Sequence, residues 1–234
     1  MWIYSFKLPK KVLTALVFAF FAVAITFVKS SFISVPTLSE IKPIYEGDSH
    51  KKAMSFTCNV AWGNEYIPSM LSVLEEKDVK ITFFIEGRWA ENFPEILKLI
   101  TSKGHEIGNH GYSHAHHASL TLEQNMNEIK QAEDVILEIT GKRPELFAPP
   151  YGEFSDQTIE AAKNMECKLI MWSIDTIDWK KPGVDYIVNK VLDNAGNGKI
   201  VLMHPTEDTV RALPTIMENL IHQGFEICPV SKIL

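Results

Sequence analysis

The sequence contains few cysteines and no excess of positive charge. Its three cysteines, Cys58, Cys167 and Cys228, are widely separated along 234 residues. They are too few for a disulfide framework, and no Cys-x-x-Cys pair is present to form a thiolate zinc site. The net charge is −6 at pH 7. This balance argues against a nucleic acid as a partner, because phosphate binding requires a basic surface.

Acidic residues are also absent from the first 29 positions, which do contain four lysines. These are Lys7, Lys10, Lys11 and Lys29. Residues 12–28 form an uncharged apolar run, and a helix of that length spans about 25 Å, the short end of what crosses a membrane. The lysines on its N-terminal side predict that residues 1–11 form a cytoplasmic tail and that the chain after residue 30 is extracytoplasmic.

We therefore expect a transmembrane or signal-anchor helix over residues 12–28. The alternative is a cleaved signal peptide, which would leave the protein secreted. The Ala-Val-Ala triplet at residues 22–24 resembles a cleavage site but lies inside the apolar run, which favours the anchor. Residues 29–50 show no sustained periodicity and contain two prolines, so they predict a linker before a domain over residues 51–234.

Apolar runs of strand length alternate with amphipathic helical patterns in residues 51–234. The predicted strands are Ala53–Val60, Val79–Ile85, His105–Asn109, Glu145–Ala148, Lys168–Ile174, Lys199–Met203 and Phe225–Val230. A capping box, Thr121 to Gln124, predicts the start of one intervening helix. Alternating strands and helices predict an α/β fold with a mostly parallel sheet, open or barrel-like, whose sites lie at the carboxyl ends of the strands.

A histidine-rich segment follows the third predicted strand. His110 and His114 are four residues apart, and two neutral imidazoles at this spacing can bind one divalent metal ion. His116 and His117 follow directly. Taken alone, this spacing is weak evidence, and a polar surface loop is the alternative interpretation.

An aspartate and a histidine follow two later strands. Asp175 and Asp178 come after the run that ends at Ile174, and His204 comes directly after Met203. A carboxylate beside an imidazole fixes its tautomer and raises its pKa, as a general acid requires. The alternative for the two aspartates is a turn or a helix cap, where this residue type is common.

Taken together, the motifs of residues 53–230 resemble the polysaccharide deacetylase, or NodB-homology, domain. The matching segments are residues 55–59, 80–84, 104–114, 147–152, 172–179 and 200–204. The resemblance implies a distorted (β/α) barrel of about seven parallel strands. It also implies metal-dependent removal of acetyl groups from a glycan such as peptidoglycan, chitin or xylan. The sequences of residues 59–63 and 147–150 resemble those of a sporulation-associated subgroup.

The same resemblance implies a role for individual residues. His110 and His114 match the two metal-ligand histidines, for zinc, cobalt or nickel. Asp178 matches the residue that tunes His204, which protonates the leaving amine. The matching residues of the substrate groove are Trp179, Tyr151, Pro149, Pro150 and Leu202.

Three positions depart from the pattern of active members. Asn59 and Val60 replace two aspartates, the general base and the third metal ligand, and Ala148 replaces an arginine that positions the base. An amide accepts no proton near neutral pH and a valine has no lone pair. A general base contributes about 10²–10⁴-fold in rate, and catalytic zinc has three protein ligands. Metal binding is therefore expected to be weak or absent.

Replacement ligands are present in the sequence. The candidates for a third ligand are Glu65, Asp175, His116, His117 and the amide oxygen of Asn59. For Glu65, the first turn of a helix is the alternative role, because the helix dipole favours an acid there.

Two functions are compatible with this set of residues. One is a carbohydrate deacetylase with a nonstandard base, and the other is a noncatalytic glycan-binding or structural protein of the envelope or spore. The three substitutions favour impaired activity, whereas the retained histidines and Asp178 argue that the site still serves a purpose. Trp62 is a candidate for stacking on a sugar, and Trp172 is expected in the core.

Overall fold

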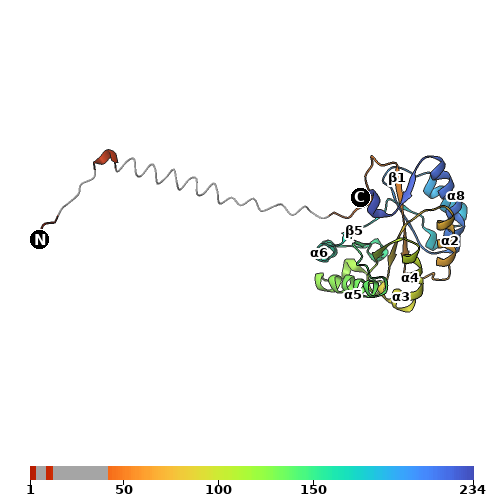
Figure 1. Cartoon of the computed structure of the whole chain (residues 1–234), viewed down its shortest axis with the longest axis horizontal. Coiled ribbons are helices and arrows are strands. Elements are labelled where there is room, and N and C mark those ends of the chain that lie inside the picture. Colours follow the sequence, from red (N-terminus) through yellow and green to blue (C-terminus); the bar gives the residue numbers. More distant parts are fainter. Residues whose placement is uncertain (4–8, 13–41) are drawn as a thin grey trace. The chain divides into compact units, whose positions relative to one another are not determined.

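The computed structural model describes residues 1–3, 9–12 and 42–234 (Figure 1). The chain divides into two units, residues 1–40 and 41–234. Nearly all of the predicted anchor over residues 12–28 lies outside the described residues, as does the linker up to residue 41. Among the residues that are described, no helix is both long and apolar enough to cross a membrane.

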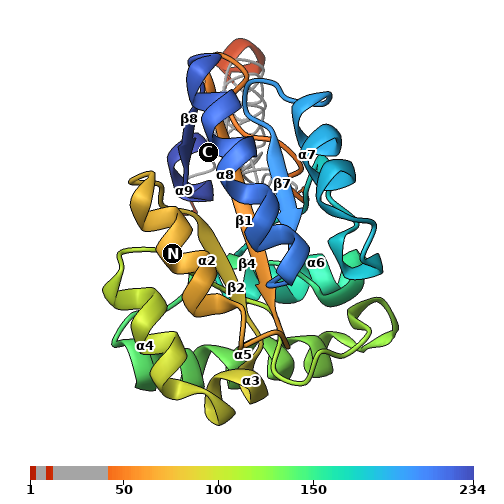
Figure 2. The same cartoon turned by 90° about the vertical axis from the view of Figure 1, so that its right-hand side faces the viewer.

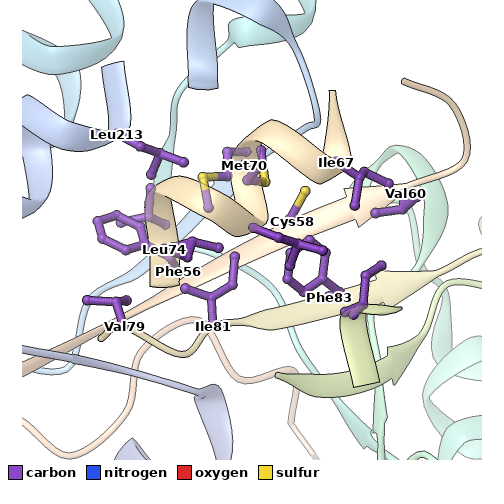
Figure 3. Packing of buried hydrophobic residues seen from close by; sticks show 14 of the residues in the cluster. Phe56, Cys58, Val60, Ile67, Met70, Leu74, Val79, Ile81, Phe83 and Leu213 are labelled. Carbon is purple, nitrogen blue, oxygen red and sulfur yellow. The ribbon is translucent and has the colours of Figure 1, made fainter. Parts of the chain in front are cut away.

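The first strand of the domain, β1 (Ala53–Val60), is buried along its whole length, and apolar and polar side chains alternate along most of it. One face carries apolar side chains of the core: Met54, Phe56, Cys58 and Val60. The residues between them include the polar Ser55, Thr57 and Asn59, which point to the opposite face. Figure 3 shows Val60 beside Ile67, at the start of α2 (Ile67–Glu76). The strand therefore separates an apolar layer under α2 from a barrel interior in which its polar side chains lie beside a second apolar cluster that includes Ala53 and Phe84.

The strands of the domain pair in parallel and form one curled, partly open barrel. Their order is β5-β4-β3-β2-β1-β7-β6, and β8 also pairs with β1. The other strands are β2 (Thr82–Ile85), β3 (Glu106–Asn109), β4 (Leu146–Phe147), β5 (Lys168–Leu169), β6 (Ile174–Asp175), β7 (Ile200–Met203) and β8 (Glu226–Cys228). Because all strands run the same way, the loops at their carboxyl ends gather at one end of the barrel.

Helices connect successive strands and cover the outside of the sheet. They are α3 (Gly87–Asn92), α4 (Pro94–Ser102), α5 (Leu122–Thr140), α6 (Asp156–Asn164), α7 (Val184–Leu192), α8 (Glu207–His222) and α9 (Val230–Ile233). Three 3-10 turns are η1 (His117–Ser119), η2 (Pro150–Gly152) and η3 (Asp178–Lys180). Helix α8 packs between α2 and α7 in front of β1 and β7 (Figure 2). The predicted capping box of α5 is present, with both Thr121 and Gln124 bonded as expected.

One predicted strand is in fact two strands on opposite edges of the sheet. The run Lys168–Ile174 was expected to be continuous, but β5 pairs with β4 and β6 pairs with β7. Between them the chain pairs with Ile44, whose backbone N–H donates to Leu169 (2.9 Å) and whose carbonyl accepts from Met171 (2.7 Å). The prediction was wrong here because an unbroken apolar run carries no signal for a change of partner strand.

The same contacts place the end of the predicted linker in the domain. Ile44 forms a parallel bridge with Ile170, and Glu46 forms an antiparallel bridge with Lys199. Residues 44–46 therefore lie across the gap between the two edge strands. The linker was expected to reach residue 50, but its last residues are part of the barrel, because their backbone groups complete the hydrogen bonding of these edges.

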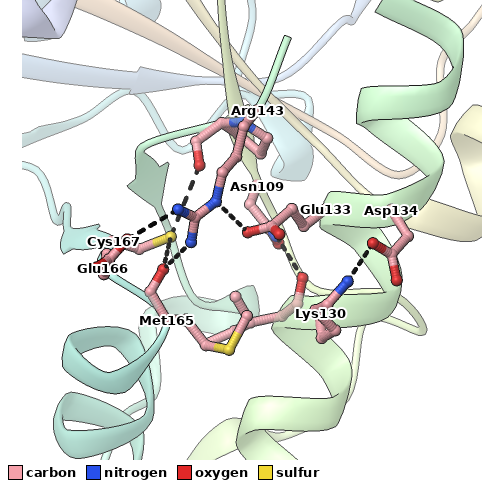
Figure 4. Close-up of polar contacts among 10 residues, drawn as sticks. Asn109, Lys130, Glu133, Asp134, Arg143, Met165, Glu166 and Cys167 are labelled. Atoms are coloured by element: carbon pink, nitrogen blue, oxygen red, sulfur yellow. Dashed lines mark hydrogen bonds and ion pairs between the residues drawn. The ribbon is translucent and has the colours of Figure 1, made fainter. Parts of the chain in front are cut away.

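Polar side chains fasten α5 to the sheet beside the histidine-rich segment (Figure 4). The Asn109 side chain donates to the Ile129 carbonyl of α5 (2.8 Å) and accepts from the Gly111 backbone (2.8 Å). Arg143, just beyond α5, pairs with Glu133 at 2.9 Å. These bonds hold the end of β3, and with it the start of the loop that carries the histidines, in one position.

Candidate functional site

A pocket of about 440 Å³ opens at the carboxyl ends of the strands. It is lined by Asn59, Trp62, His110, His114, Tyr151, Trp172, Asp175, Trp179, Leu202 and His204. Seven of the ten site residues named from the sequence are in this set. The other three, Asp178, Pro149 and Pro150, are buried and do not line the pocket. Residues from five separate segments of the chain therefore converge on one cavity.

His110 is held in a single tautomer. Its ring is 2% exposed, and its Nδ1 lies 2.7 Å from the Ala148 carbonyl. Because a carbonyl only accepts, Nδ1 carries the hydrogen and Nε2 keeps its lone pair. Burial, and then the neighbouring His114, lower the pKa of His110 well below its usual value. The ring is therefore neutral at pH 7, the form in which imidazole binds a metal.

His114 lies against His110 in a strained turn. Its φ is +55°, an uncommon conformation for a residue with a side chain. The two rings meet edge to face with centroids 5.2 Å apart, and His114 meets Tyr151 in the same way at 4.6 Å. Burial, and then His204, lower the pKa of His114. The pair presents two neutral imidazoles to the pocket.

The donors in the pocket do not fit a three-ligand metal centre. Val60, at the position of the third family ligand, has no exposed surface and packs in the apolar core (Figure 3). In the described part of the chain, no group of three His, Cys, Asp or Glu side chains could hold a metal ion. The replacement ligands proposed from the sequence therefore do not complete the site.

Four of the five replacement candidates are bonded to other groups or lie outside the pocket. Glu65 is exposed outside the pocket. His116 pairs with Glu153, and His117 is buried against Asn125. Asp175 does line the pocket, but its Oδ1 accepts from the Ile177 backbone at 2.8 Å.

Asn59, which the resemblance assigns to the general-base position, has a side-chain oxygen without a partner among the described residues. The residue is 5% exposed, and no hydrogen bond reaches its buried Oδ1 from the described residues. Ala148, at the arginine position, is 2% exposed and packs with Phe84 and Leu146. A buried amide oxygen without a partner is uncommon and costs about 1–3 kcal/mol. Asn59 therefore leaves a buried hydrogen-bond acceptor unused and supplies no base.

Asp178 and His204 form a buried and fully bonded pair. The His204 Nδ1 lies 2.8 Å from Asp178 Oδ1, and the His204 backbone N–H donates to Oδ2 at 2.6 Å. Thr209 of α8 donates its hydroxyl to the same Oδ2, also at 2.6 Å. Because the carboxylate accepts a hydrogen bond from Nδ1, Nδ1 carries the hydrogen and the neutral ring keeps its lone pair on Nε2. Sequence reasoning missed Thr209, since nothing in the pattern of α8 indicates a bond to Asp178.

Aromatic side chains form the rim of the pocket. Trp179 and Tyr151 are 51% and 55% exposed, and Trp62 stacks on the His204 ring with centroids 5.6 Å apart and an interplanar angle of 9°. Trp172, which the pattern predicts in the core, is half-buried and packs against two buried apolar clusters, and it also lines the pocket. The apolar run predicts the packing but gives no sign of which side of the ring faces a cavity.

Comparison with known proteins agrees with this architecture. A family model described as polysaccharide deacetylase matches residues 46–170, more than half of the chain. The uncharacterized protein YlxY of Bacillus subtilis is 37% identical over 82% of this chain. A peptidoglycan-N-acetylglucosamine deacetylase of Bacillus cereus is 35% identical over 77% of this chain and 67% of its own length. The chain spans 60% of the length of YlxY.

Solved structures give the same result. Wild-type BA3943 of Bacillus anthracis, described as a CE4 family pseudoenzyme, superposes with a TM-score of 0.81 at 38% identity. The match covers 82% of this chain and 69% of that one. A BA3943 mutant described as having restored enzymatic activity matches with the same TM-score at 37% identity. The chain therefore belongs to the polysaccharide deacetylase family.

Proposed function

We propose that this protein binds N-acetylated cell-wall or spore glycan in its pocket and that its deacetylase activity is impaired. The observation that carries the proposal is Asn59, a buried amide in the place of a base, beside an intact Asp178–His204 pair. The Bacillus cereus relative that is 35% identical is named as a peptidoglycan-N-acetylglucosamine deacetylase. That name supports peptidoglycan as the glycan, and a chitin-like oligosaccharide has the same N-acetylated sugars.

The impairment follows from the side chains that face the pocket. Hydrolysis of the C–N amide bond of an acetamido group requires a base for the attacking water and an acid for the leaving amine. His204 can supply the acid in the form that carries a proton on Nε2, because Asp178 Oδ1 at Nδ1 stabilises that imidazolium and fixes its ring. Asn59 cannot supply the base, a loss of about 3–5 kcal/mol of barrier lowering. The two imidazoles of His110 and His114 do not replace it with a three-ligand metal centre.

Residual hydrolysis is the second candidate function. Asp178 accepts three hydrogen bonds and fixes the His204 ring at the pocket, an arrangement that favours a site that still transfers a proton. His110 and His114 are the two residues that would hold a divalent ion such as zinc, cobalt or nickel, although they do not make a three-ligand centre.

The two candidates are separated by measurements on the purified full chain. Metal content, acetate release from N-acetylglucosamine oligomers and from peptidoglycan, and binding of the same oligomers by calorimetry are compared. We expect binding with no acetate release above a His204→Ala control and less than one metal ion per chain. Rapid acetate release would overturn the impairment, and failure to bind either glycan would overturn the binding function.

We also propose that residues 12–28 anchor the protein in a membrane, with residues 42–234 outside the cytoplasm. The support is the uncharged run of 17 residues and the three lysines before it. A role in sporulation is proposed from the resemblance of residues 59–63 and 147–150 to the sporulation-associated subgroup. Cell fractionation and protease treatment of intact cells test the anchor. Without protease, an anchored protein stays with the membrane fraction. Protease added to intact cells degrades its domain from outside.

A further inference from the structure

Exposed aromatic side chains are concentrated at one place on the domain. Within residues 42–234, five are exposed: Tyr45, Trp62, Tyr151, Trp179 and Tyr186. Three of these five, Trp62, Tyr151 and Trp179, line the same pocket. They come from three different loops at the carboxyl ends of strands. An apolar side chain left in water at a cavity is a sign of a binding surface.

Trp62 is held in place by the turn that follows it. Gly63 has a φ of +76°, and a Cβ added to it would lie 2.2 Å from the Pro205 carbonyl oxygen. The backbone after Trp62 therefore packs directly against the residue that follows His204. The Gly63 carbonyl also accepts from the Tyr66 backbone at 3.0 Å. The indole is thus presented by a fixed turn and loses little freedom when a ligand binds.

His204 covers one side of the Trp62 ring. The two rings are stacked at 5.6 Å, yet Trp62 keeps 43% of its surface exposed. The free surface of the indole therefore lies away from the imidazole. A ligand group on that surface sits next to the Asp178–His204 pair but not on it. This arrangement creates a separate contact beyond the place where an acetamido group meets Nε2 of His204.

We propose that Trp62 is the platform for a second sugar unit, so that the site recognises a chain of N-acetylated amino sugars and not a single sugar. The proposal rests on the proposed glycan binding. The ring face of a β-linked amino sugar carries C–H groups that pack on an aromatic plane, and tryptophan offers the largest such plane at low entropic cost. The primary unit is then held among Tyr151, Trp179 and His204.

Calorimetric titration of the full chain with N-acetylglucosamine and its β-1,4-linked dimer, tetramer and pentamer tests the platform. We expect the wild-type Kd to fall as the ligand grows from one unit to four. In Trp62→Ala, the ratio of tetramer affinity to monomer affinity should fall at least about tenfold, the scale of one interface aromatic. Trp62→Phe should keep most of the gain, and Tyr186→Ala, an exposed aromatic outside the pocket, should change nothing.

Each outcome bears on one proposal. If Trp62→Ala keeps the full gain in affinity with length, the platform does not exist, while glycan binding stands. If the variant loses monomer and tetramer affinity equally, Trp62 acts only on the primary unit through His204, and the second-unit proposal is overturned. If the wild-type chain binds no oligomer, the proposed function itself fails. Thermal unfolding of each variant shows whether a lost affinity reflects a misfolded chain.

Discussion

Asp178 holds His204 by both ends of the residue: one carboxylate oxygen lies 2.8 Å from the ring Nδ1 and the other accepts from the backbone N–H at 2.6 Å. The carboxylate has no exposed surface. The loop after β7 and the turn after β6 are thus joined by one buried side chain. This relationship makes the pair a structural element as well as a chemical one, and it yields the first prediction.

Replacing Asp178 with alanine should destabilise the domain. The change leaves the His204 ring, the His204 backbone and the Thr209 hydroxyl without their acceptor in a buried place. We expect the free energy of unfolding to fall by about 3–5 kcal/mol. Thr209→Val, which removes one donor and keeps the shape, should cost only about 1 kcal/mol. Urea unfolding followed by circular dichroism measures both, and equal losses in the two variants would contradict the central position of Asp178.

Restoring the family residues should create a metal site. In Asn59→Asp with Val60→Asp and Ala148→Arg, position 59 regains a carboxylate at the pocket, whereas the carboxylate at position 60 must turn out of the apolar core to become the third ligand. We expect zinc, cobalt or nickel to bind and to stabilise the variant by about 2.7 kcal/mol when the free ion is at about 100 times its Kd. Metal analysis and thermal unfolding with and without the ion measure this. An unchanged metal content would show that His110 and His114 do not face the restored carboxylate.

Val60→Asp should lower the free energy of unfolding when no metal is present. Val60 packs beside Ile67 in the apolar core (Figure 3), so Val60→Asp alone buries an unpaired carboxylate. We expect a loss of at least about 3 kcal/mol in the absence of metal. Val60→Ala is the control for the lost volume and should cost less. If Val60→Asp proves as stable as the wild type, the side chain at position 60 turns towards the pocket and not into the core.

Stability should fall as the pH is lowered below 6.5 because of His105. Burial, and then Lys80, lower the pKa of His105 to about 4, and its Nδ1 accepts from the Ile81 backbone at 3.2 Å. The unfolded chain takes up a proton near pH 6.5 and the folded chain only near pH 4, so unfolding is favoured progressively between these values. Below about pH 4 this contribution levels off.

The slope in that window should approach about 1.4 kcal/mol per pH unit for His105 alone. His110, His114 and His117, whose pKa values are also lowered by burial, add to it in the same direction. His105→Asn keeps an acceptor for Ile81 and removes the titration, so its free energy of unfolding should depend less on pH. Urea unfolding at pH 7, 6, 5 and 4 makes the comparison, and parallel curves for the two proteins would rule out His105 as the source.

Much of the barrel follows from local sequence pattern. The alternation of Met54, Phe56, Cys58 and Val60 with polar neighbours fixes β1, and the Thr121–Gln124 capping box fixes the start of α5. The chemical meaning of Asn59 and Ala148 is likewise a property of the residues themselves, because an amide is no base and a methyl group carries no charge. Such features depend on side-chain type and on neighbours within one turn or one pleat.

Contacts between distant segments follow from packing alone. The apolar run Lys168–Ile174 changes its partner strand where Ile170 pairs with Ile44, a residue from the far end of the domain sequence. The bond from Thr209 to Asp178 arises in the same way. The sequence pattern of each segment does not indicate its distant partner. The two partners meet only when the elements between them have folded.

Local sequence pattern is enough to predict the parallel α/β elements and the chemistry that the pocket lacks. The stacking of Trp62 on His204 and the burial of Val60 in the core follow from the folded barrel. The reason is physical: hydrogen-bonding capacity and periodicity belong to each residue and its neighbours, whereas a contact partner is selected by the way the whole barrel closes and excludes water.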